Sequence, residues 1–154
     1  MERRDFLKKA GAGTAVAAGT LAAPAIVKAR TEIAMVTTWP RDFPGLGTGA
    51  QRFAESLSEL SDGRLNVTYY ASGERVKPFD SFDEVASGNA QMYHAADYYW
   101  KGKHPGWAYF TAVPFGFVYS EINAWINWGG GQELWDELAG EFGLKCLTCG
   151  NTGV

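Results

Sequence analysis

Strand patterns and helix patterns alternate after residue 30, and this alternation constrains the fold more than any other feature of the sequence. Residues 32–39 are rich in β-forming side chains and end before Pro40, and residues 65–70 alternate between apolar and polar side chains. Between them, residues 48–60 place apolar side chains on one face of a helix. A helix between two strands is typical of a crossover that leaves both strands parallel. We therefore expect an α/β fold with a mainly parallel sheet flanked by helices.

A glycine-rich stretch follows the first expected strand. Gly45, Gly47 and Ala50 fit the letters of a dinucleotide-binding fingerprint, G-x-G-x-x-A. In such sites the first glycine stands directly at the end of the strand, whereas here five residues, two of them prolines, separate Trp39 from Gly45. We therefore discount a nucleotide site. A simpler prediction remains, in which the start of the helix near Thr48 offers free backbone N–H groups to a carboxylate.

The alternation continues through a short helix and a third strand. Ser81 and Glu84 stand three residues apart at the head of a helix expected over residues 82–87, which is the spacing of a capping box. Apolar and polar side chains then alternate over residues 92–97, where His94 falls on the inward face of a strand. A lone histidine in such a position is typical of a hydrogen-bonded core residue.

Aromatic side chains concentrate just beyond this third strand. Tyr98, Tyr99 and Trp100 follow it at its carboxyl end, and Trp39 stands at the corresponding end of the first strand. Ligands of open α/β sheets bind outside the carboxyl ends of the strands, so rings with polar tips at this place predict a small-molecule cleft. A half-buried edge of the core, with hydroxyl and indole groups reaching water, explains the same pattern equally well.

Two further helices and a fourth strand are expected in the last third of the chain. One helix begins near Ser120 and ends at the glycines 129–131, and the next carries apolar side chains at intervals of four over residues 134–142. The tryptophans of these helices are interpreted as packing residues. The apolar run 144–149 is typical of a buried strand, and the motif G-N-T-G at 150–153 opens a loop after it.

The first 29 residues have the composition of an export signal rather than of a folded domain. A basic segment is followed by residues 10–26, which carry no charge but are too rich in alanine and glycine to form a good membrane span. The basic segment matches the twin-arginine export pattern through Arg3, Arg4, Phe6 and Leu7. We expect residues 1–29 to be a twin-arginine signal peptide, cleaved after Ala29 to release a soluble periplasmic protein.

Charge and composition argue against several functions. Without residues 1–29, which hold five basic and two acidic side chains, the chain keeps 9 basic and 15 acidic side chains, a net charge of −6, so nucleic acid is not an expected partner. Neither His94 nor His104 stands in a hydrolase or metal motif. Cys146 and Cys149 form a single C-x-x-C, interpreted as structural thiols with a local disulfide as the alternative. We expect no catalytic residues, no metal site and no cofactor within this chain.

The order of the motifs resembles a known family of receptors. A strand ends in D-Y-Y-W at 97–100, an aromatic run then leads to P-F-G at 114–116, and G-N-T-G follows at 150–153, all behind an export signal. This order resembles the solute-binding subunits of TRAP transporters, and in particular the branch that binds α-keto acids, lactate and similar carboxylates. The resemblance covers essentially the whole chain after the signal.

The resemblance implies a fold and a function. It implies that residues 30–154 form the first, incomplete lobe of a type II periplasmic-binding-protein-like receptor, and that the chain is the amino-terminal part of a longer protein. It further implies that the receptor captures a small organic carboxylate in the periplasm for the TRAP membrane subunits, without catalysing a reaction. A periplasmic oxidoreductase exported by the twin-arginine route is the alternative, because that route often serves proteins that carry redox cofactors.

The resemblance also implies residue roles, position by position. Tyr99, with Tyr98, is implied as a ring and hydroxyl contact to the ligand, Asn151 as an amide contact to its carboxylate, and Trp39 as a further contact. The arginine that clamps the carboxylate and the protein ligands of a cation that bridges it are implied to lie after Val154. The sequence leaves the oligomeric state open, with a dimer among the options.

Replacing Arg3 and Arg4 together by lysine is expected to keep the precursor in the cytoplasm. The translocase reads a pair of planar guanidinium groups, whereas lysine offers a compact point charge. The measurement is the amount of mature protein in a periplasmic extract, and a normal yield from the double variant would contradict the twin-arginine assignment.

Overall fold

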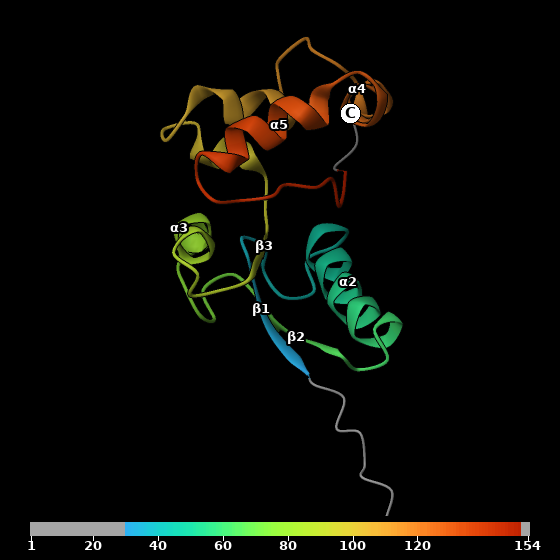
Figure 1. The fold of residues 1–154 in the computed structure, drawn as a ribbon, viewed down its shortest axis with the longest axis vertical. Coiled ribbons are helices and arrows are strands. Elements are labelled where there is room, and N and C mark those ends of the chain that lie inside the picture. Colours follow the sequence, from blue (N-terminus) through green and yellow to red (C-terminus); the bar gives the residue numbers. More distant parts are fainter. Residues whose placement is uncertain (1–29, 152–154) are drawn as a thin grey trace, which may run out of the picture.

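The computed structural model describes residues 30–151, and its centre is a parallel three-stranded sheet (Figure 1). The strands are β1 (Thr31–Thr37), β2 (Leu65–Tyr70) and β3 (Met92–His94), in the spatial order β2-β1-β3. Both β2 and β3 run parallel to β1, and β3 pairs only with the last three residues of β1. The predicted parallel α/β arrangement is confirmed.

Helices cover both faces of the sheet because the two connections between strands cross it in opposite directions. The helix α2 (Leu46–Leu60) connects β1 to β2, and α3 (Ser81–Ala86), preceded by the 3-10 turn η1 (Pro78–Asp80), connects β2 to β3. Figure 1 shows α2 and α3 on opposite sides of the strands. Because β2 and β3 flank β1, the two crossovers leave in opposite directions and create a switch point between the carboxyl ends of β1 and β3.

Small side chains let α2 approach the sheet closely. Ala50 and Ala54 are buried against Met35 of the central strand. Gly47 approaches even more closely, since a Cβ atom at this position would lie 2.5 Å from the carbonyl oxygen of Pro40. The first turn of α2 is therefore held directly against the loop that ends β1.

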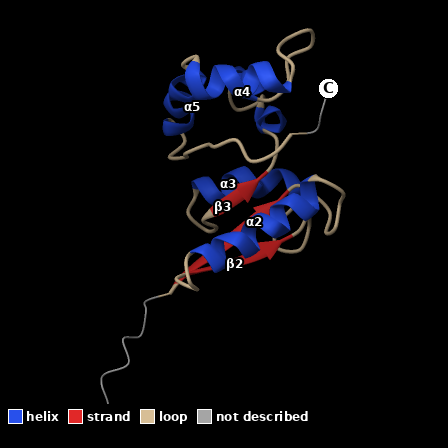
Figure 2. Ribbon diagram, turned by 90° about the vertical axis from the view of Figure 1, so that its right-hand side faces the viewer, coloured by secondary structure: helices blue, strands red, loops and turns tan. Residues whose placement is uncertain are grey.

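A second apolar cluster lies beyond the carboxyl ends of the strands and is built mainly from aromatic side chains. Trp107 is fully buried at its centre, with its ring 5.5 Å from that of Phe82 in α3 and 5.6 Å from that of Phe142. The short helices around it form a separate layer above the sheet (Figure 2). These are η2 (Asp97–Trp100), η3 (Pro105–Phe110), α4 (Tyr119–Trp128) and α5 (Gly131–Gly140).

The predicted capping box at Ser81 and Glu84 is wrong. Ser81 is already the first residue of α3, and its hydroxyl donates to the carbonyl oxygen of Pro78 at 2.7 Å. Glu84 faces Arg75 instead, with 3.7 Å between the carboxylate oxygen and Nε. The 3-10 turn that runs into α3 takes the place of a side-chain cap, because it supplies partners for the first turn.

The strand expected over 92–97 ends at residue 94, and the strand expected over 144–149 does not form. Asp97 begins the 3-10 helix η2 instead. Residues 144–149 run beneath α5, above the sheet, where Gln132 Nε2 donates to the carbonyl oxygen of Cys146 at 2.9 Å (Figure 1). The helices expected in this part are confirmed as α4 and α5, with α4 beginning one residue before Ser120.

Two predictions at the ends of the chain fall outside the described residues. The signal assigned to residues 1–29 is one, and the end of the G-N-T-G motif, residues 152–154, is the other. Over residues 30–151, no helix combines the length and the apolar character that crossing a membrane requires.

Gly47 and Gly49 make a matched pair of positions in the first turns of α2. Gly47→Ala is expected to lower the free energy of unfolding by about 1–3 kcal/mol, because its methyl group would clash with the backbone of Pro40. The methyl group of Gly49→Ala would have no atom within 4 Å, and this variant is expected to raise the free energy of unfolding by about 0.5–1 kcal/mol through helix propensity. Urea unfolding of both variants measures the difference, and equal effects would contradict the close approach.

Candidate functional site

The carboxyl ends of β1 and β3 are joined by a buried side-chain hydrogen bond. β1 ends at Thr37, and two residues later Trp39 turns its indole inward so that Nε1 donates to Nδ1 of His94 at 2.8 Å. The backbone supports the same junction, since the Thr38 N–H donates to the carbonyl oxygen of His94 at 3.4 Å. This junction lies at the switch point of the sheet, the place where open α/β sheets bind ligands.

His94 is a neutral imidazole in this setting. Its burial lowers its pKa below the ordinary value of 6.5, because a charged ring would lose its hydration. Since Nδ1 accepts the indole hydrogen bond, the proton of the neutral ring is carried by Nε2. The interpretation of His94 as a hydrogen-bonded core residue is confirmed, and Trp39 is its partner.

Tyr99 extends the junction into an aromatic rim. Its ring centroid lies 6.1 Å from that of Trp39, 5.2 Å from that of Phe79 and 4.6 Å from that of Tyr98. Burial and the neighbouring Tyr98 hydroxyl raise the pKa of Tyr99 to about 12, so its hydroxyl stays protonated and can donate a hydrogen bond. We call Trp39, His94, Tyr98 and Tyr99 the aromatic rim.

The structure brings three of the four sequence-predicted contacts together, namely Trp39, Tyr98 and Tyr99. Trp39 is buried, Tyr99 is half-buried, and Tyr98 is 38% exposed, with its backbone N–H donating to Thr111 Oγ1 at 3.2 Å. Asn151 is the last described residue and is exposed. It follows Gly150, which lines a cavity of about 330 Å³ together with Tyr93, Asp97 and Trp135.

A buried polar centre behind the rim was missed by sequence reasoning. Asp97 is 4% exposed, and its carboxylate accepts from Trp135 Nε1 at 2.8 Å and from the Tyr93 hydroxyl at 3.2 Å. The Tyr93 hydroxyl also lies 3.9 Å from Cys146 Sγ. The signal was present in the sequence, because an acidic residue inside an aromatic run needs buried donors. One of these donors, Trp135, belongs to α5 and lies 38 residues further along the chain.

Burial controls the protonation of this centre. It raises the pKa of Asp97 from an ordinary 3.8 to about 6, although the hydrogen bonds from Trp135 and Tyr93 oppose the change. The pKa of the Cys146 thiol rises to about 12, first through burial and then through the Asp97 carboxylate. Burial likewise raises the pKa of Tyr93. Cys146 is therefore an unreactive thiol, and it and Cys149 are both free rather than joined in a disulfide.

Arg41, two residues after Trp39, is already engaged in an ion pair. Arg41 forms a bidentate hydrogen-bonded ion pair with Glu74, with 2.8 Å from Nε to Oε1 and 2.5 Å from Nη2 to Oε2. His104 lies in the separate layer of helices, where Nδ1 accepts from the Gly106 N–H at 3.1 Å. Among residues 30–151, no three His, Cys, Asp or Glu side chains are grouped so that they could hold a metal ion.

The parallel sheet flanked by helices matches the lobes of TRAP periplasmic solute-binding proteins. The sequence profile described as bacterial extracellular solute-binding protein, family 7 (DctP), matches residues 35–154. The chain belongs to this family of TRAP solute-binding proteins. Family membership favours the receptor interpretation over the oxidoreductase alternative.

A curated relative supports the same assignment. The chain is 32% identical over 160 residues to the monocarboxylate 2-oxoacid-binding periplasmic protein of Nostoc sp. (strain PCC 7120). The match covers 100% of this chain and 44% of the Nostoc protein, so this chain spans less than half the length of that relative.

Solved structures show the same fold. A TRAP periplasmic solute-binding protein from Colwellia psychrerythraea, with bound calcium and pyruvate, is 38% identical at a TM-score of 0.72 over 74% of this chain and 35% of its own. A TRAP transporter solute-binding protein from Bordetella bronchiseptica, a dimer with calcium and picolinate in one site, is 27% identical at a TM-score of 0.80 over 82% and 38%.

The polar centre predicts a pH dependence of stability. Between pH 3.8 and about 6, folded Asp97 holds a proton that the unfolded chain has released, so the contribution of Asp97 to stability is present below pH 3.8 and is lost as the pH rises to about 6. Two pKa units correspond to about 3 kcal/mol. Asp97→Asn keeps an acceptor for Trp135 but does not titrate.

The difference in unfolding free energy between Asp97→Asn and the wild-type chain should therefore change by about 3 kcal/mol in favour of the variant from pH 3 to pH 7. Taking the difference removes the opposite dependence of His94, whose lowered pKa costs stability below pH 6.5 in both proteins. Urea unfolding at several pH values measures it, and a constant difference would refute the raised pKa.

Proposed function

We propose that this chain contributes the aromatic wall of a periplasmic receptor that captures a small 2-oxo acid or a similar carboxylate for TRAP membrane subunits, and that it catalyses no reaction. The observation that carries the proposal is the aromatic rim at the switch point of a parallel sheet, in a chain of the solute-binding family. Two relatives hold pyruvate and picolinate, which are both compact carboxylates. Export by the twin-arginine route belongs to the same proposal.

The rim suits a small ligand that is partly planar. The rings of Trp39 and Tyr99 offer apolar faces, and the Tyr99 hydroxyl offers a neutral donor that remains protonated at physiological pH. Tyr98, on the exposed side of Tyr99, and the amide of Asn151 would add contacts from the solvent side. Such groups fix the orientation of a carboxylate and can donate hydrogen bonds to its oxygens.

Charge neutralisation must come from outside these contacts. Arg41 is paired with Glu74 and Arg75 with Glu84, so neither guanidinium group is available to clamp an anion without breaking an ion pair. We therefore propose that the carboxylate is neutralised by an arginine from the part of the receptor that this chain does not span and by a cation bound there. Calcium accompanies the ligand in both the Colwellia and the Bordetella structures. A dimer, as in the Bordetella protein, stays a prediction for this chain.

A chimera tests the function directly. Residues 30–154 of this chain replace the matched region of the Nostoc protein, and calorimetry measures the binding of pyruvate, lactate and longer 2-oxo acids in the presence of calcium. Binding of at least one of these acids is expected. A folded chimera that binds none of them would contradict the proposal.

Tyr99→Phe in the same chimera is expected to weaken binding by about 1–3 kcal/mol, because a buried oxygen of the ligand would lose its donor. Tyr119→Phe is the matched control, since Tyr119 is 52% exposed, begins α4 and does not belong to the aromatic rim. Calorimetry with pyruvate compares the two variants. Equal affinities would show that Tyr99 only packs.

A further inference from the structure

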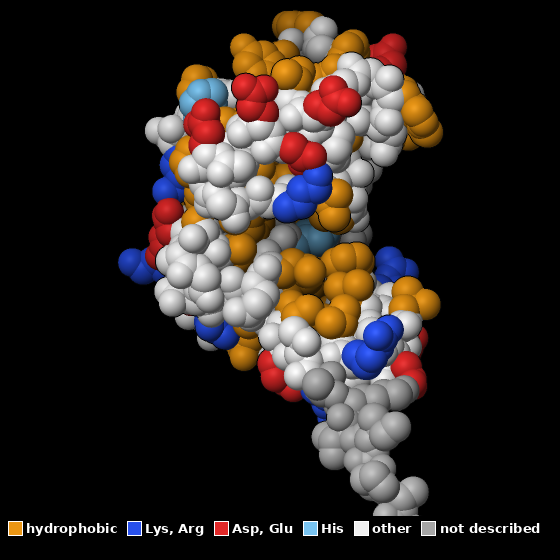
Figure 3. All heavy atoms as spheres, viewed as in Figure 1, with side chains coloured by type: hydrophobic (Ala, Val, Ile, Leu, Met, Phe, Trp, Pro, Cys, Tyr) orange, Lys and Arg blue, Asp and Glu red, His pale blue; other side chains and the backbone are white. Residues whose placement is uncertain are grey.

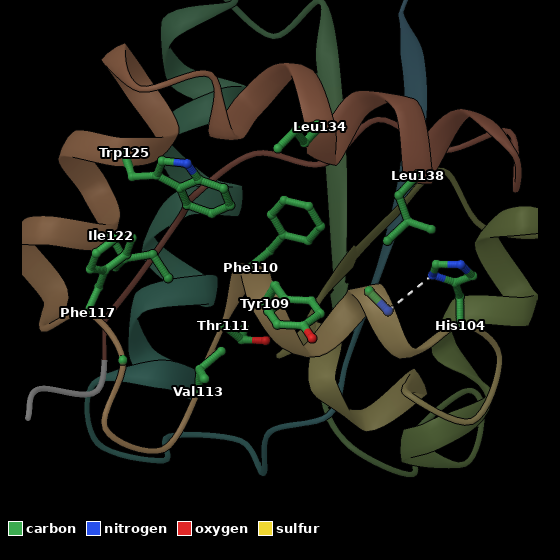
Figure 4. Close-up of a pocket in the computed structure, with 12 residues that line it drawn as sticks. His104, Tyr109, Phe110, Thr111, Val113, Phe117, Ile122, Trp125, Leu134 and Leu138 are labelled. Carbon is green, nitrogen blue, oxygen red and sulfur yellow. Dashed lines mark hydrogen bonds between the residues drawn. The ribbon is translucent and has the colours of Figure 1, made fainter.

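An apolar groove opens on the helical layer, away from the aromatic rim. It lies between η3, α4 and α5 and has a volume of about 470 Å³ (Figure 4). Its lining is almost entirely apolar. The side chains that form its floor and walls include Tyr109, Phe110, Phe117, Trp125, Leu134 and Leu138.

The floor of the groove is rigid and the walls are open to water. The Phe110 ring is stacked between Trp125, at 5.7 Å and 13°, and Trp135, at 5.3 Å and 6°. On the walls, Phe117 is 61% exposed and Leu134 is 54% exposed. Contiguous apolar surface of this kind marks an interaction site in a protein that folds in water.

Two polar groups of the groove, the Thr111 hydroxyl and His104 Nδ1, are occupied by local hydrogen bonds. Thr111 Oγ1 donates to the carbonyl oxygen of Trp107 at 3.2 Å and accepts from the Tyr98 N–H. His104 Nδ1 accepts from the Gly106 N–H, as the dashed line in Figure 4 marks. A polar small molecule would lose its hydration here and gain few partners, so the occupant is apolar on the side that faces the groove.

An acidic row runs along α5, the helix that supplies Leu134 and Leu138 to the groove. Glu133, Glu137 and Glu141 stand four residues apart along and just beyond α5, each exposed, and the first two stand next to the wall residues Leu134 and Leu138. Within residues 30–151, none of the three takes part in an ion pair. Acidic side chains are visible on the face that α5 presents in Figure 3. Like charges at this spacing repel, and a basic neighbour would relieve the repulsion.

The charges decide between the candidate occupants. A symmetric contact between two copies would place the same patch on both sides, and two acidic rows would face each other. An anionic lipid surface would be repelled in the same way. A polypeptide with an apolar stripe and basic side chains beside it satisfies both the groove and the acidic row.

We propose that the groove binds an amphipathic helix with lysine or arginine beside its apolar stripe, supplied by the part of the receptor that this chain does not span. The chain covers 44% of the Nostoc relative and 35–38% of the structural relatives, so each of these receptors has a long further polypeptide that can cover the groove. The inference rests on family membership and on the surface itself, and it does not depend on the ligand.

Co-expression tests the proposal. The 154-residue chain is produced together with the part of the Nostoc protein outside the matched region, and the two are co-purified. Association is expected. The double variant Phe117→Ser, Leu134→Ser should weaken it by at least about tenfold in dissociation constant, since apolar anchors dominate such interfaces. The control is Phe53→Ser, Leu60→Ser, which changes two exposed apolar residues of α2, distant from the groove.

A charge-reversal pair tests the acidic row separately. Glu133→Lys, Glu137→Lys should weaken association about tenfold at low salt and remove most of its salt dependence. Glu55→Lys, Glu59→Lys places the same reversal, at the same spacing, on α2 and should have little effect. Thermal melts followed by circular dichroism confirm that all four double variants remain folded.

Several outcomes would overturn the proposal. One is the absence of association when both polypeptides are soluble and folded. A second is a homodimer of the 154-residue chain, seen by sedimentation, that only the groove variants disrupt, because a second copy would then occupy the groove. A third is association that responds equally to the groove variants and to the α2 controls. Because the measurement is association, a failure of carboxylate binding in the chimera would leave this result unaffected.

Discussion

The buried hydrogen bond from Trp39 to His94 joins the ends of β1 and β3, and the backbone of Trp39 connects them to β2. β3 pairs with β1 over only three residues, up to Thr37 opposite His94, which gives a short ladder. The indole bond at 2.8 Å extends the junction beyond the last ladder pair, and the carbonyl oxygen of Trp39 accepts from the N–H of Ser72 after β2 at 2.9 Å. Leaving either buried partner unpaired would cost about 1–3 kcal/mol, so the indole has one favourable orientation. That orientation supplies the ring against which Tyr99 packs, and the rim and the sheet therefore depend on the same bond.

Much of the sheet unit could be predicted because its signals are local. The strands β1 and β2 and the helix α2 follow from periodicity and from Pro40, and the parallel arrangement then places Trp39 and Tyr99 at one edge. The errors arise where tertiary contacts override local pattern. Asp97 fits the alternation of a strand, yet it leaves the strand to accept hydrogen bonds from Tyr93 and from Trp135, which lies 38 residues further along the chain. The apolar run 144–149 is buried at Cys146 against the helical layer, and periodicity alone cannot distinguish that burial from a place in a sheet.

The electrostatics of the rim bear on the proposed carboxylate site, because the described residues would form only one side of it. Tyr99 and His94 are held in their neutral forms by burial, so they can orient an anion without balancing its charge. The Asp97 carboxylate stands behind them, where an ionised form would repel a bound carboxylate, and burial favours its protonated form up to about pH 6. A site with these groups needs a positive charge on its opposite side, and both structural relatives described above hold calcium together with their ligand.

The rim and the apolar groove share structural parts although they face different directions. Phe110 lines both the groove and the cavity that contains Asp97, and it stacks at 5.3 Å on Trp135. The indole of Trp135 donates in turn to Asp97, the residue that begins the D-Y-Y-W turn carrying Tyr99. Closely packed rings transmit displacement rather than absorb it, because there is no free volume between them. An occupied groove would keep Phe110 and Trp135 in place, and the hydrogen bond to Asp97 would then hold the turn that positions Tyr99. The exposed groove and the proposed ligand wall are therefore two ends of one packed unit.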